Sequence, residues 1–141
     1  LASLDGRSVF DIPAGALEGD TTFTFIPQPV PTDYPARLSF AHNSFQLNAV
    51  DAGGSPVISF TLPVTVTLSY TDSDIASIFE DTLRLYYWDE DWVEALSTCP
   101  EGAYTRDLDG NTFSLPVCHL SEFAVLGETL QFFIPVVMVQ R

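Results

Sequence analysis

The sequence predicts an all-β protein, an antiparallel β-sandwich with one short helix and an extra C-terminal strand. Three observations predict this class. Short segments in which polar and apolar residues alternate follow one another along the chain, at a spacing of about 8–12 residues that is typical of sandwiches. Clusters of Gly, Pro, Asn and Asp separate these segments. The length of 141 residues suits a single domain with one core.

Two segments show the strand pattern most clearly. In residues 21–26, Phe23 and Phe25 share one face, and in residues 62–70 the even-numbered apolar side chains alternate with Thr and Ser. This period of two indicates antiparallel strands with one face buried. Further strands are predicted at residues 8–12, 38–40, 45–50, 82–88, 92–96, 103–107, 112–117 and 122–126.

One stretch, residues 72–79, has helical spacing. Asp72 or Ser73 is placed to cap it at its N-terminus. We expect one or two helical turns that cross between the sheets. The apolar stripe of this helix consists of Ile75, Ile78 and Phe79.

The charge of the chain excludes several kinds of partner. There are 5 basic and 19 acidic side chains, a net charge of −14, and the arginines are scattered. Binding to nucleic acid or to an anionic membrane needs clustered cations, so neither partner is expected. No apolar run approaches the ~18 residues of a membrane-spanning helix. The sequence has no dinucleotide fingerprint and no phosphate-binding glycine loop, and we expect no cofactor and no bound metal.

Cys99 and Cys118 are the two cysteines, and neither lies in a pattern with metal-ligand spacing. They form either two buried thiols or a disulfide. Because the flanking segments are predicted to be neighbouring strands, we expect a disulfide, which contributes about 3 kcal/mol for a loop of this size. Such a bond, in a chain without an initiating Met or a basic-then-apolar leader, indicates a processed and secreted protein.

Residues 130–139 break the alternating pattern, because they are apolar on both faces. Such a strand must be covered on both sides, and Pro135 removes one hydrogen-bond donor, so an edge or inserted strand is predicted. We therefore divide the chain into a sandwich over residues 1–127 and an apolar strand over residues 128–141. The side chains expected to mediate self-assembly are Phe132, Phe133, Ile134, Val136, Val137, Met138 and Val139.

An apolar strand of this kind either folds back onto an open edge of its own domain or enters a groove in a neighbouring copy. The sequence leaves both open. The second case is β-strand addition, in which main-chain hydrogen bonds supply affinity and alternate side chains fill pockets. A head-to-tail contact of that type does not close on itself and produces a filament. The expected partner is therefore a second copy of the chain, in a head-to-tail homo-oligomer.

The run from Cys118 to Leu126, Cys-His-Leu-Ser-Glu-Phe-Ala-Val-Leu, carries a resemblance to a known family. It is similar to the end of the proteolysis site in the autoproteolysis-inducing domains of adhesion receptors and polycystins. Upstream, Trp88, Trp92 and Cys99 resemble the tryptophans and the earlier cysteine of that motif.

A second segment carries a related resemblance. Residues 12–17, Ile-Pro-Ala-Gly-Ala-Leu, followed by residues 21–26, look like the opening of the related sandwich of ankyrins, netrin receptors and zonula occludens proteins. An acidic, lysine-free version of this kind resembles bacterial cell-surface proteins. The resemblance implies a β-sandwich on the outside of the cell.

The resemblance also implies self-cleavage. In the family, a Ser or Thr hydroxyl attacks the preceding carbonyl, an N-to-O acyl shift makes an ester, and water hydrolyses it. Carried over, Ser121 is the nucleophile, His119 the general base and Leu120–Ser121 the scissile bond. The chain departs from the family in having one cysteine pair rather than two and in placing Glu122 after the nucleophile. The alternative is that His119 and Ser121 hydrogen-bond backbone groups in a turn before the last core strand.

Four other features have simpler interpretations. Residues 107–111, Asp-Leu-Asp-Gly-Asn, fit a hairpin turn joining Tyr104 and Phe113 better than a calcium loop, since no bidentate Glu follows. His42 is expected in a loop, without ligand partners. The acidic residues expected on solvated faces are Asp72, Asp74, Glu80, Asp81, Asp89, Glu90 and Asp91. An aromatic set that resembles a sugar platform, but of which alternation places about half in the core, is Tyr86, Tyr87, Trp88 and Trp92.

The leading interpretation is an extracellular structural subunit, a β-sandwich that forms filaments through its C-terminal strand. A second interpretation is a self-cleaving module cut at Leu120–Ser121, which would turn over once and would not be an enzyme in the usual sense. A third is a stalk or adhesive domain of a larger surface protein, in which the tail is an export or anchoring signal.

Overall fold

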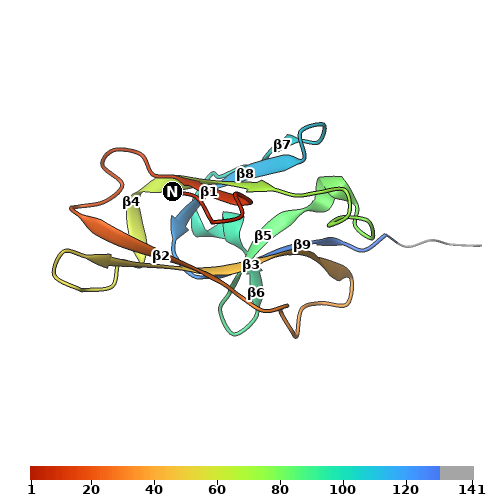
Figure 1. Ribbon diagram of the computed structural model, residues 1–141, viewed down its shortest axis with the longest axis horizontal. Coiled ribbons are helices and arrows are strands. Elements are labelled where there is room, and N and C mark those ends of the chain that lie inside the picture. The colour runs from red at the N-terminus through yellow and green to blue at the C-terminus, as the bar shows by residue number, and fades with distance from the viewer. Residues whose placement is uncertain (131–141) are drawn as a thin grey trace, which may run out of the picture.

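The computed structural model describes residues 1–130, which form two antiparallel sheets packed as a sandwich (Figure 1). The four-stranded sheet has the order β1–β4–β8–β7 and the five-stranded sheet the order β2–β3–β9–β5–β6. The predicted all-β class and antiparallel sandwich are confirmed, the predicted helix is absent from residues 1–130, and the predicted extra C-terminal strand lies largely outside the described residues. The strands are β1 (Ser8–Asp11), β2 (Thr21–Pro27), β3 (Leu38–Asp51), β4 (Ser59–Ser69), β5 (Arg84–Trp88), β6 (Trp92–Glu94), β7 (Thr105–Asp107), β8 (Thr112–His119) and β9 (Glu122–Glu128).

The core lies between the two sheets and follows the predicted alternation. In β4, Val64, Val66 and Leu68 are buried, whereas the Thr side chains between them are more exposed. Aromatic rings from both sheets meet in the centre, where the centroids of Phe10 and Phe45 lie 5.7 Å apart with their rings edge to face. One continuous core therefore holds the two sheets together.

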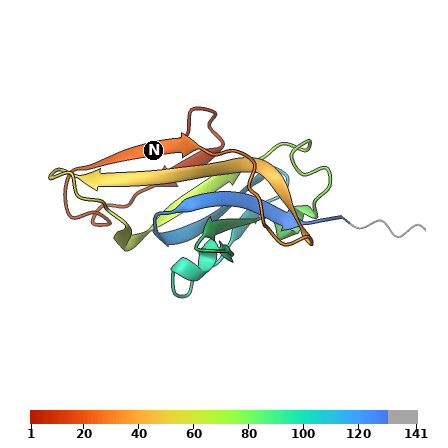
Figure 2. The same cartoon turned by 90° about the horizontal axis from the view of Figure 1, so that it is seen from below.

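β3 joins two segments that the sequence analysis predicts as separate strands, 38–40 and 45–50. It is the long strand between β2 and β9 in Figure 2, and its pairing with β9 shifts register between Phe40 and Ser44. His42 lies within this irregularity with a φ of 61°, so its predicted position in a loop is wrong. A bulge lets the extra residues leave the ladder while the strand continues.

Residues 72–79 do not form the predicted helix; they form a series of turns. The caps assigned to Asp72 and Ser73 belong instead to Thr71 and Asp74, whose side chains each accept a hydrogen bond from the other's main-chain N–H. The helix does not form because Ile78, which is buried, pairs its main chain with Thr129 as an isolated bridge. Only two 3-10 helices, η1 (Glu80–Thr82) and η2 (Ala95–Thr98), occur in residues 1–130.

The connection between β2 and β3 covers the outer face of the five-stranded sheet. The indole Nε1 of Trp92 donates to the main-chain oxygen of Thr32 at 3.2 Å. Tyr86 and Leu126 are buried in the same outer cluster. The β2–β3 connection therefore buries Tyr86 of β5 and Trp92 of β6 in a second, smaller core.

Main-chain pairing of the sandwich extends to the end of the described residues. The N–H of Thr129 donates to Arg37 and that of Leu130 to Ser77, at 3.0 and 2.8 Å. Within residues 1–130 no helix is long and apolar enough to cross a membrane. The rest of the strand predicted over 130–139 lies outside the described residues. So do the predicted self-assembly side chains Phe132, Phe133, Ile134, Val136, Val137, Met138 and Val139.

Candidate functional site

The sheet order gives the sandwich two sides, which are held in different ways. We call the side where β6 and β7 are the edge strands the closed side, and the side where β1 and β2 are the edge strands the open side. On the closed side, η2 packs against β5, β6 and β8 and fills the space between the sheets. The open side carries the groove described below.

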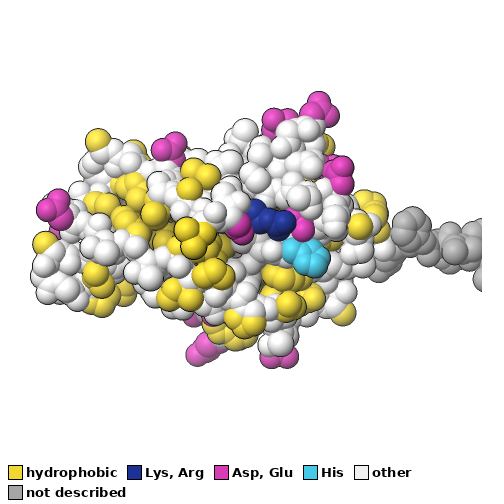
Figure 3. All heavy atoms as spheres, in the orientation of Figure 1, with side chains coloured by type: hydrophobic (Ala, Val, Ile, Leu, Met, Phe, Trp, Pro, Cys, Tyr) yellow, Lys and Arg dark blue, Asp and Glu magenta, His cyan; other side chains and the backbone are white. Residues whose placement is uncertain are grey.

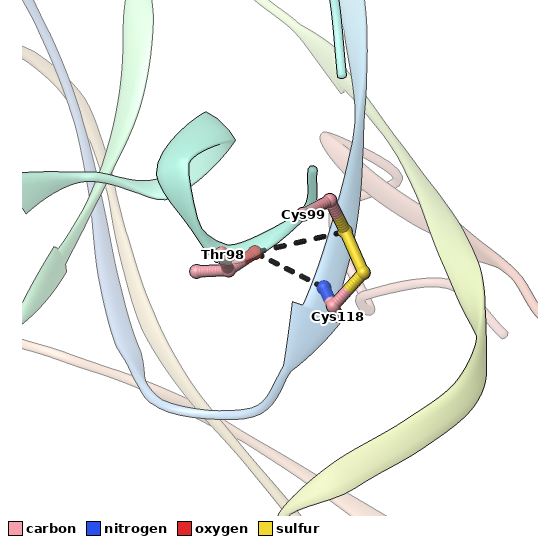
Figure 4. The surroundings of a disulfide bond; sticks show 3 residues. All are labelled: Thr98, Cys99 and Cys118. Carbon is pink, nitrogen blue, oxygen red and sulfur yellow. Dashed lines mark hydrogen bonds between the residues drawn. A yellow bond between two sulfur atoms is a disulfide. The ribbon is translucent and has the colours of Figure 1, made fainter. Parts of the chain in front are cut away.

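A disulfide ties the closed side together, as Figure 4 shows. Cys99, directly after η2, is bonded to Cys118 on β8, and their Cα atoms lie 5.2 Å apart. The main-chain N–H of Cys118 donates to the Thr98 hydroxyl at 3.0 Å. The predicted disulfide is confirmed, and its loop corresponds to a stabilisation of about 3 kcal/mol on the chain-entropy estimate.

A partly buried tyrosine, Tyr104, adds a polar link across the closed side. The Tyr104 hydroxyl accepts a hydrogen bond from the main-chain N–H of Leu85 on β5 at 3.3 Å. Burial raises the pKa of Tyr104 far above that of a free phenol, so the hydroxyl stays neutral. The Arg106 guanidinium carbon lies 4.8 Å from the centroid of the Tyr104 ring, in a cation–π contact that covers the ring from solvent.

The residues of the predicted self-cleavage site lie at the β8–β9 connection. The His119 Nδ1 lies 3.3 Å from the carbonyl oxygen of Leu120, and the Ser121 hydroxyl donates to the carbonyl oxygen of Trp88 at 3.3 Å. No hydrogen bond within residues 1–130 joins His119 to Ser121. The His119 ring packs edge to face against Tyr87, with centroids 4.9 Å apart. Both side chains therefore contact main-chain carbonyls, and cleavage at Leu120–Ser121 stays a prediction.

The aromatic set considered as a sugar platform is divided between the interior and the surface. Tyr86 and Trp92 are buried, Tyr87 is half-buried and packs against the main core, and Trp88 is 38 % exposed. The Trp88 and Trp92 rings meet edge to face with centroids 5.2 Å apart. They do not present a flat surface on which a sugar ring could stack.

The loop considered as a calcium site is a hairpin turn. β7 and β8 pair directly, and the Asp107 carboxylate accepts a hydrogen bond from the main-chain N–H of Gly110 at 3.0 Å. Among the described residues no group of three or more His, Cys, Asp or Glu side chains could hold a metal ion. The hairpin prediction is confirmed.

One carboxylate predicted on a solvated face is buried instead. Asp74 is 8 % exposed, and its Oδ2 lies 2.9 Å from a guanidinium nitrogen of Arg7. Burial by itself would raise the pKa of Asp74, but hydrogen bonds from Thr71 and the charge of Arg7 outweigh it and hold the pKa below its usual value. Arg7 also donates to the His42 carbonyl oxygen on β3 at 3.5 Å, so the Arg7 side chain links the two sheets on the open side.

The chain begins with a hairpin that covers the edge of β1. We call residues 1–11 the N-terminal hairpin. Ala2 pairs with Val9, and the N–H of Phe10 donates to the Leu1 carbonyl oxygen at 2.7 Å. Gly6 has a φ of 72°, the left-handed conformation that the tight turn requires. The Asp5 carboxylate in this turn accepts from the Ser3 hydroxyl and the Arg7 N–H, which hold the pKa of Asp5 below its usual value.

An apolar groove lies between the N-terminal hairpin and strands β2 and β3, and we call it the edge groove. Its volume is about 610 Å³, within the range of ligand-binding pockets. Hydrophobic side chains gather in Figure 3 over the region where Figure 1 places β1, β2 and the N-terminus. The apolar residues that line the groove are Leu1, Ala2, Leu4, Phe23, Phe25, Pro27, Val30 and Phe40.

Comparison with protein-family models, with curated proteins and with solved structures found no match to this chain. The class of protein comes from the structure itself, which is a two-sheet antiparallel β-sandwich with a disulfide between Cys99 and Cys118. The resemblance to autoproteolysis-inducing domains stays a prediction.

Sequence reasoning did not find the edge groove. The alternation of Phe with Thr in residues 21–26 was the sequence signal for this strand, because it is typical of a strand with one solvent-exposed face. What the pattern does not contain is the position of this strand at the edge of its sheet, or the N-terminal hairpin opposite it.

Proposed function

We propose that this protein is an extracellular structural subunit that assembles into filaments by donating its apolar C-terminal strand to a neighbouring copy. The observation that carries the proposal is the open side of the sandwich, where β2, an edge strand of seven residues, runs beside the apolar edge groove. An uncovered strand edge next to an apolar groove is the arrangement that β-strand addition uses.

The sequence after Leu130 supplies a suitable donor. Residues 131–139 contain no charged side chain, and nearly all of them are apolar. Burying their side chains removes several hundred Å² of apolar surface, which corresponds to a gain on the order of 10 kcal/mol before the entropy of association is subtracted. A segment of this kind gains more from being covered by protein than from contact with water.

The net charge of −14 opposes association of identical subunits. Salt screens this repulsion, because the Debye length is about 8 Å at physiological ionic strength. The attraction in strand addition acts at contact distance and is not screened. We therefore expect assembly to strengthen as the salt concentration rises.

The disulfide supports the extracellular part of the proposal. Disulfides such as Cys99–Cys118 persist in oxidising compartments and are rare in the reducing cytosol. The resemblance of the chain to bacterial cell-surface sandwiches points to the same location.

The experiment compares the full chain with a chain that stops after Leu130. We expect the full chain to sediment as oligomers and to form filaments in electron micrographs, and the shortened chain to remain monomeric. Ile134→Asp, which places a charge in the donor segment, is expected to abolish assembly. Gln131→Asp adds the same charge at a polar position and serves as the matched control, with assembly retained.

Two results would contradict the proposal. One is a full chain that stays monomeric at high salt and high concentration. The other is a shortened chain that assembles as well as the full chain, which would support the stalk-domain interpretation instead.

A further inference from the structure

The open edge of β2 differs from the other sheet edges among the described residues. The N-terminal hairpin covers the edge of β1, and the remaining edge strands, β6 and β7, have three residues each. β2 has seven residues, a length of about 23 Å at the usual strand rise. It is therefore the longest uncovered edge in residues 1–130.

The main-chain groups that β2 leaves unpaired with β3 can be identified from the register. Phe25 lies opposite Leu47, whose N–H donates in the other direction, to the Ser121 carbonyl oxygen. Phe23 lies opposite Ala49, whose carbonyl oxygen accepts from Val57. In an antiparallel pair, hydrogen-bonded and non-hydrogen-bonded positions alternate. The N–H and C=O groups of Phe23 and Phe25 therefore point to the free edge.

The same two residues also line the edge groove with their side chains. Phe25 stacks on Phe45 of the core with centroids 4.9 Å apart, and Phe23 is half-buried. Further along the groove, Val30 is 65 % exposed and Leu4 is fully exposed. A strand added to β2 would bond to these main-chain groups and cover these apolar side chains in one step.

The groove is lined by more apolar than polar side chains, although Gln28, His42 and Asn43 also line it. Its acidic residue, Asp5, is already hydrogen-bonded to Ser3 and to the Arg7 N–H. The Ser44 hydroxyl donates to the carbonyl oxygens of Gln28 and Pro29. Within the described part of the chain no buried side-chain polar atom lacks a partner. An uncharged, apolar strand is the occupant that these properties fit.

From these observations we infer that the edge groove and the free edge of β2 form the acceptor site for residues 131–139 of a second copy of the chain. This inference rests on the proposed function and adds to it the place where the donated strand binds. Because β9, which precedes the donor segment, and the acceptor site lie at different places on the sandwich, the proposed contact is head-to-tail and extends into a filament.

Pro135 restricts the register of the donated strand. Proline has no N–H, so within a strand its main chain must point away from the hydrogen-bonded neighbour. Residues of the same parity in a strand point in the same direction. The even-numbered residues, from Phe132 to Met138, would therefore bond to β2, and Pro135 would face the new outer edge.

The path of the chain favours a second copy over the same molecule. β9 ends beside Arg37 and Ser77, to which Thr129 and Leu130 donate their main-chain hydrogen bonds. In the sheet, β3 lies between β9 and β2. A strand of the same chain would have to reverse direction and cross β3 to reach the groove, whereas a strand from a neighbour needs neither step.

Amide hydrogen exchange on the full-length protein tests the inference. The reference is full-length Ile134→Asp, in which the donor is disabled. We expect the amides of Phe23 and Phe25 to be protected at least tenfold more in the assembled wild type than in the reference. The amides of Thr22 and Thr24, which pair with β3, are expected to be equally protected in both proteins.

A pair of surface variants gives an independent measurement. Val30→Glu places a charge in the edge groove, and Ile58→Glu places the same charge at a residue that is 66 % exposed elsewhere, against 65 % for Val30. We expect Val30→Glu to raise the dissociation constant of the assembly at least tenfold and Ile58→Glu to change it less than twofold.

The outcomes separate the acceptor site from the proposed function. If the chain assembles while Phe23 and Phe25 exchange as in the reference and Val30→Glu has no effect, the acceptor site is wrong and strand donation stands. If the wild type is monomeric and Phe23 and Phe25 are protected, the strand binds its own subunit, and both the acceptor inference and the filament are overturned. If it is monomeric and these amides are unprotected, both are likewise overturned.

Discussion

The two sides of the sandwich close the same gap between sheets by different means. On the closed side a disulfide, a 3-10 helix and the Tyr104 hydroxyl fill the space and connect the layers. On the open side Arg7, which is paired with Asp74 and donates to the His42 carbonyl oxygen, and the packing of Phe10 against Phe25 connect the layers, and a groove of about 610 Å³ remains. The comparison teaches that the covalent link and the proposed acceptor site lie on opposite sides of the sandwich, and that the proposed site is on the side where the edge of β2 is uncovered.

The largest expected difference between the sides concerns aromatic packing. Phe113 is 2 % exposed and lies between Tyr70 and Tyr104, with centroid distances of 6.3 and 6.0 Å. Phe113→Ala is expected to lower the free energy of unfolding by about 3–5 kcal/mol. Phe23→Ala, in the edge groove, is expected to lower the free energy of unfolding by about half as much, because the half-buried Phe23 side chain removes less apolar area from water on folding than Phe113 does. Urea unfolding of both variants in the Ile134→Asp background measures this, and equal losses would contradict the comparison.

The disulfide ranks second. We expect the double substitution Cys99→Ser and Cys118→Ser to lower the free energy of unfolding by about 3 kcal/mol, because the unfolded chain regains the freedom of the loop. The amides on the open side should keep their exchange rates. A reductant added to the double variant is the control and should have no effect. A loss of amide protection confined to the open side would show that the disulfide stabilises that side instead.

Acid should affect the open side first. The pKa of Asp74 is lower in the folded protein than in the unfolded chain, where it is about 3.9. Its contribution to stability is therefore present above that pH and is lost as the pH falls through the folded pKa. Asp74→Asn is expected to lower the free energy of unfolding at pH 7 by about 1–3 kcal/mol, and exposed Asp109→Asn by less than about 0.5 kcal/mol.

Unfolding measurements between pH 3 and pH 7 check the acid dependence. The stability of the wild type should fall below about pH 4 more steeply than that of Asp74→Asn. Exchange at the N-terminal hairpin should rise in the same range, because the Asp5 carboxylate is also held ionised by the fold. If stability depends on pH identically in the wild type and in Asp74→Asn, the Arg7–Asp74 ion pair does not stabilise the open side.

The smallest effect is expected at Ser121. Its hydroxyl donates to the Trp88 carbonyl oxygen and has no hydrogen bond to His119. We expect denaturing mass spectrometry to show one species of 15.5 kDa for the wild type and a comparable intact species for Ser121→Ala. Their free energies of unfolding should differ by less than about 0.5 kcal/mol. Two fragments divided at Leu120–Ser121 in the wild type alone would establish the self-cleaving module.

The alternating segments made most strands predictable. A half-buried strand must place every second side chain in the core, so a pattern such as that of residues 62–70 has few other solutions. The disulfide was predictable for a related reason, since neighbouring strands bring Cys99 and Cys118 within bonding distance. The hairpin at residues 107–111 followed from its turn residues.

The errors arose where distant residues override a local pattern. Residues 72–79 have helical spacing, but pairing of Ile78 with Thr129 prevents the helix. His42 looked like part of a loop, but β9 resumes its pairing with β3 at Ser44 and keeps His42 inside a bulge. Asp74 looked solvated until the fold brought Arg7 against it.

The sequence by itself determined the all-β class, the alternating core and the cysteine pair, because each depends on neighbours along the chain. Only the tertiary structure decided that β2 is an uncovered edge, that the N-terminal hairpin stands opposite it, and that the two sides close differently. The physical reason is that strand order depends on free-energy differences between pairings of segments far apart in sequence, and the period of two within each strand is the same whichever neighbour it finds.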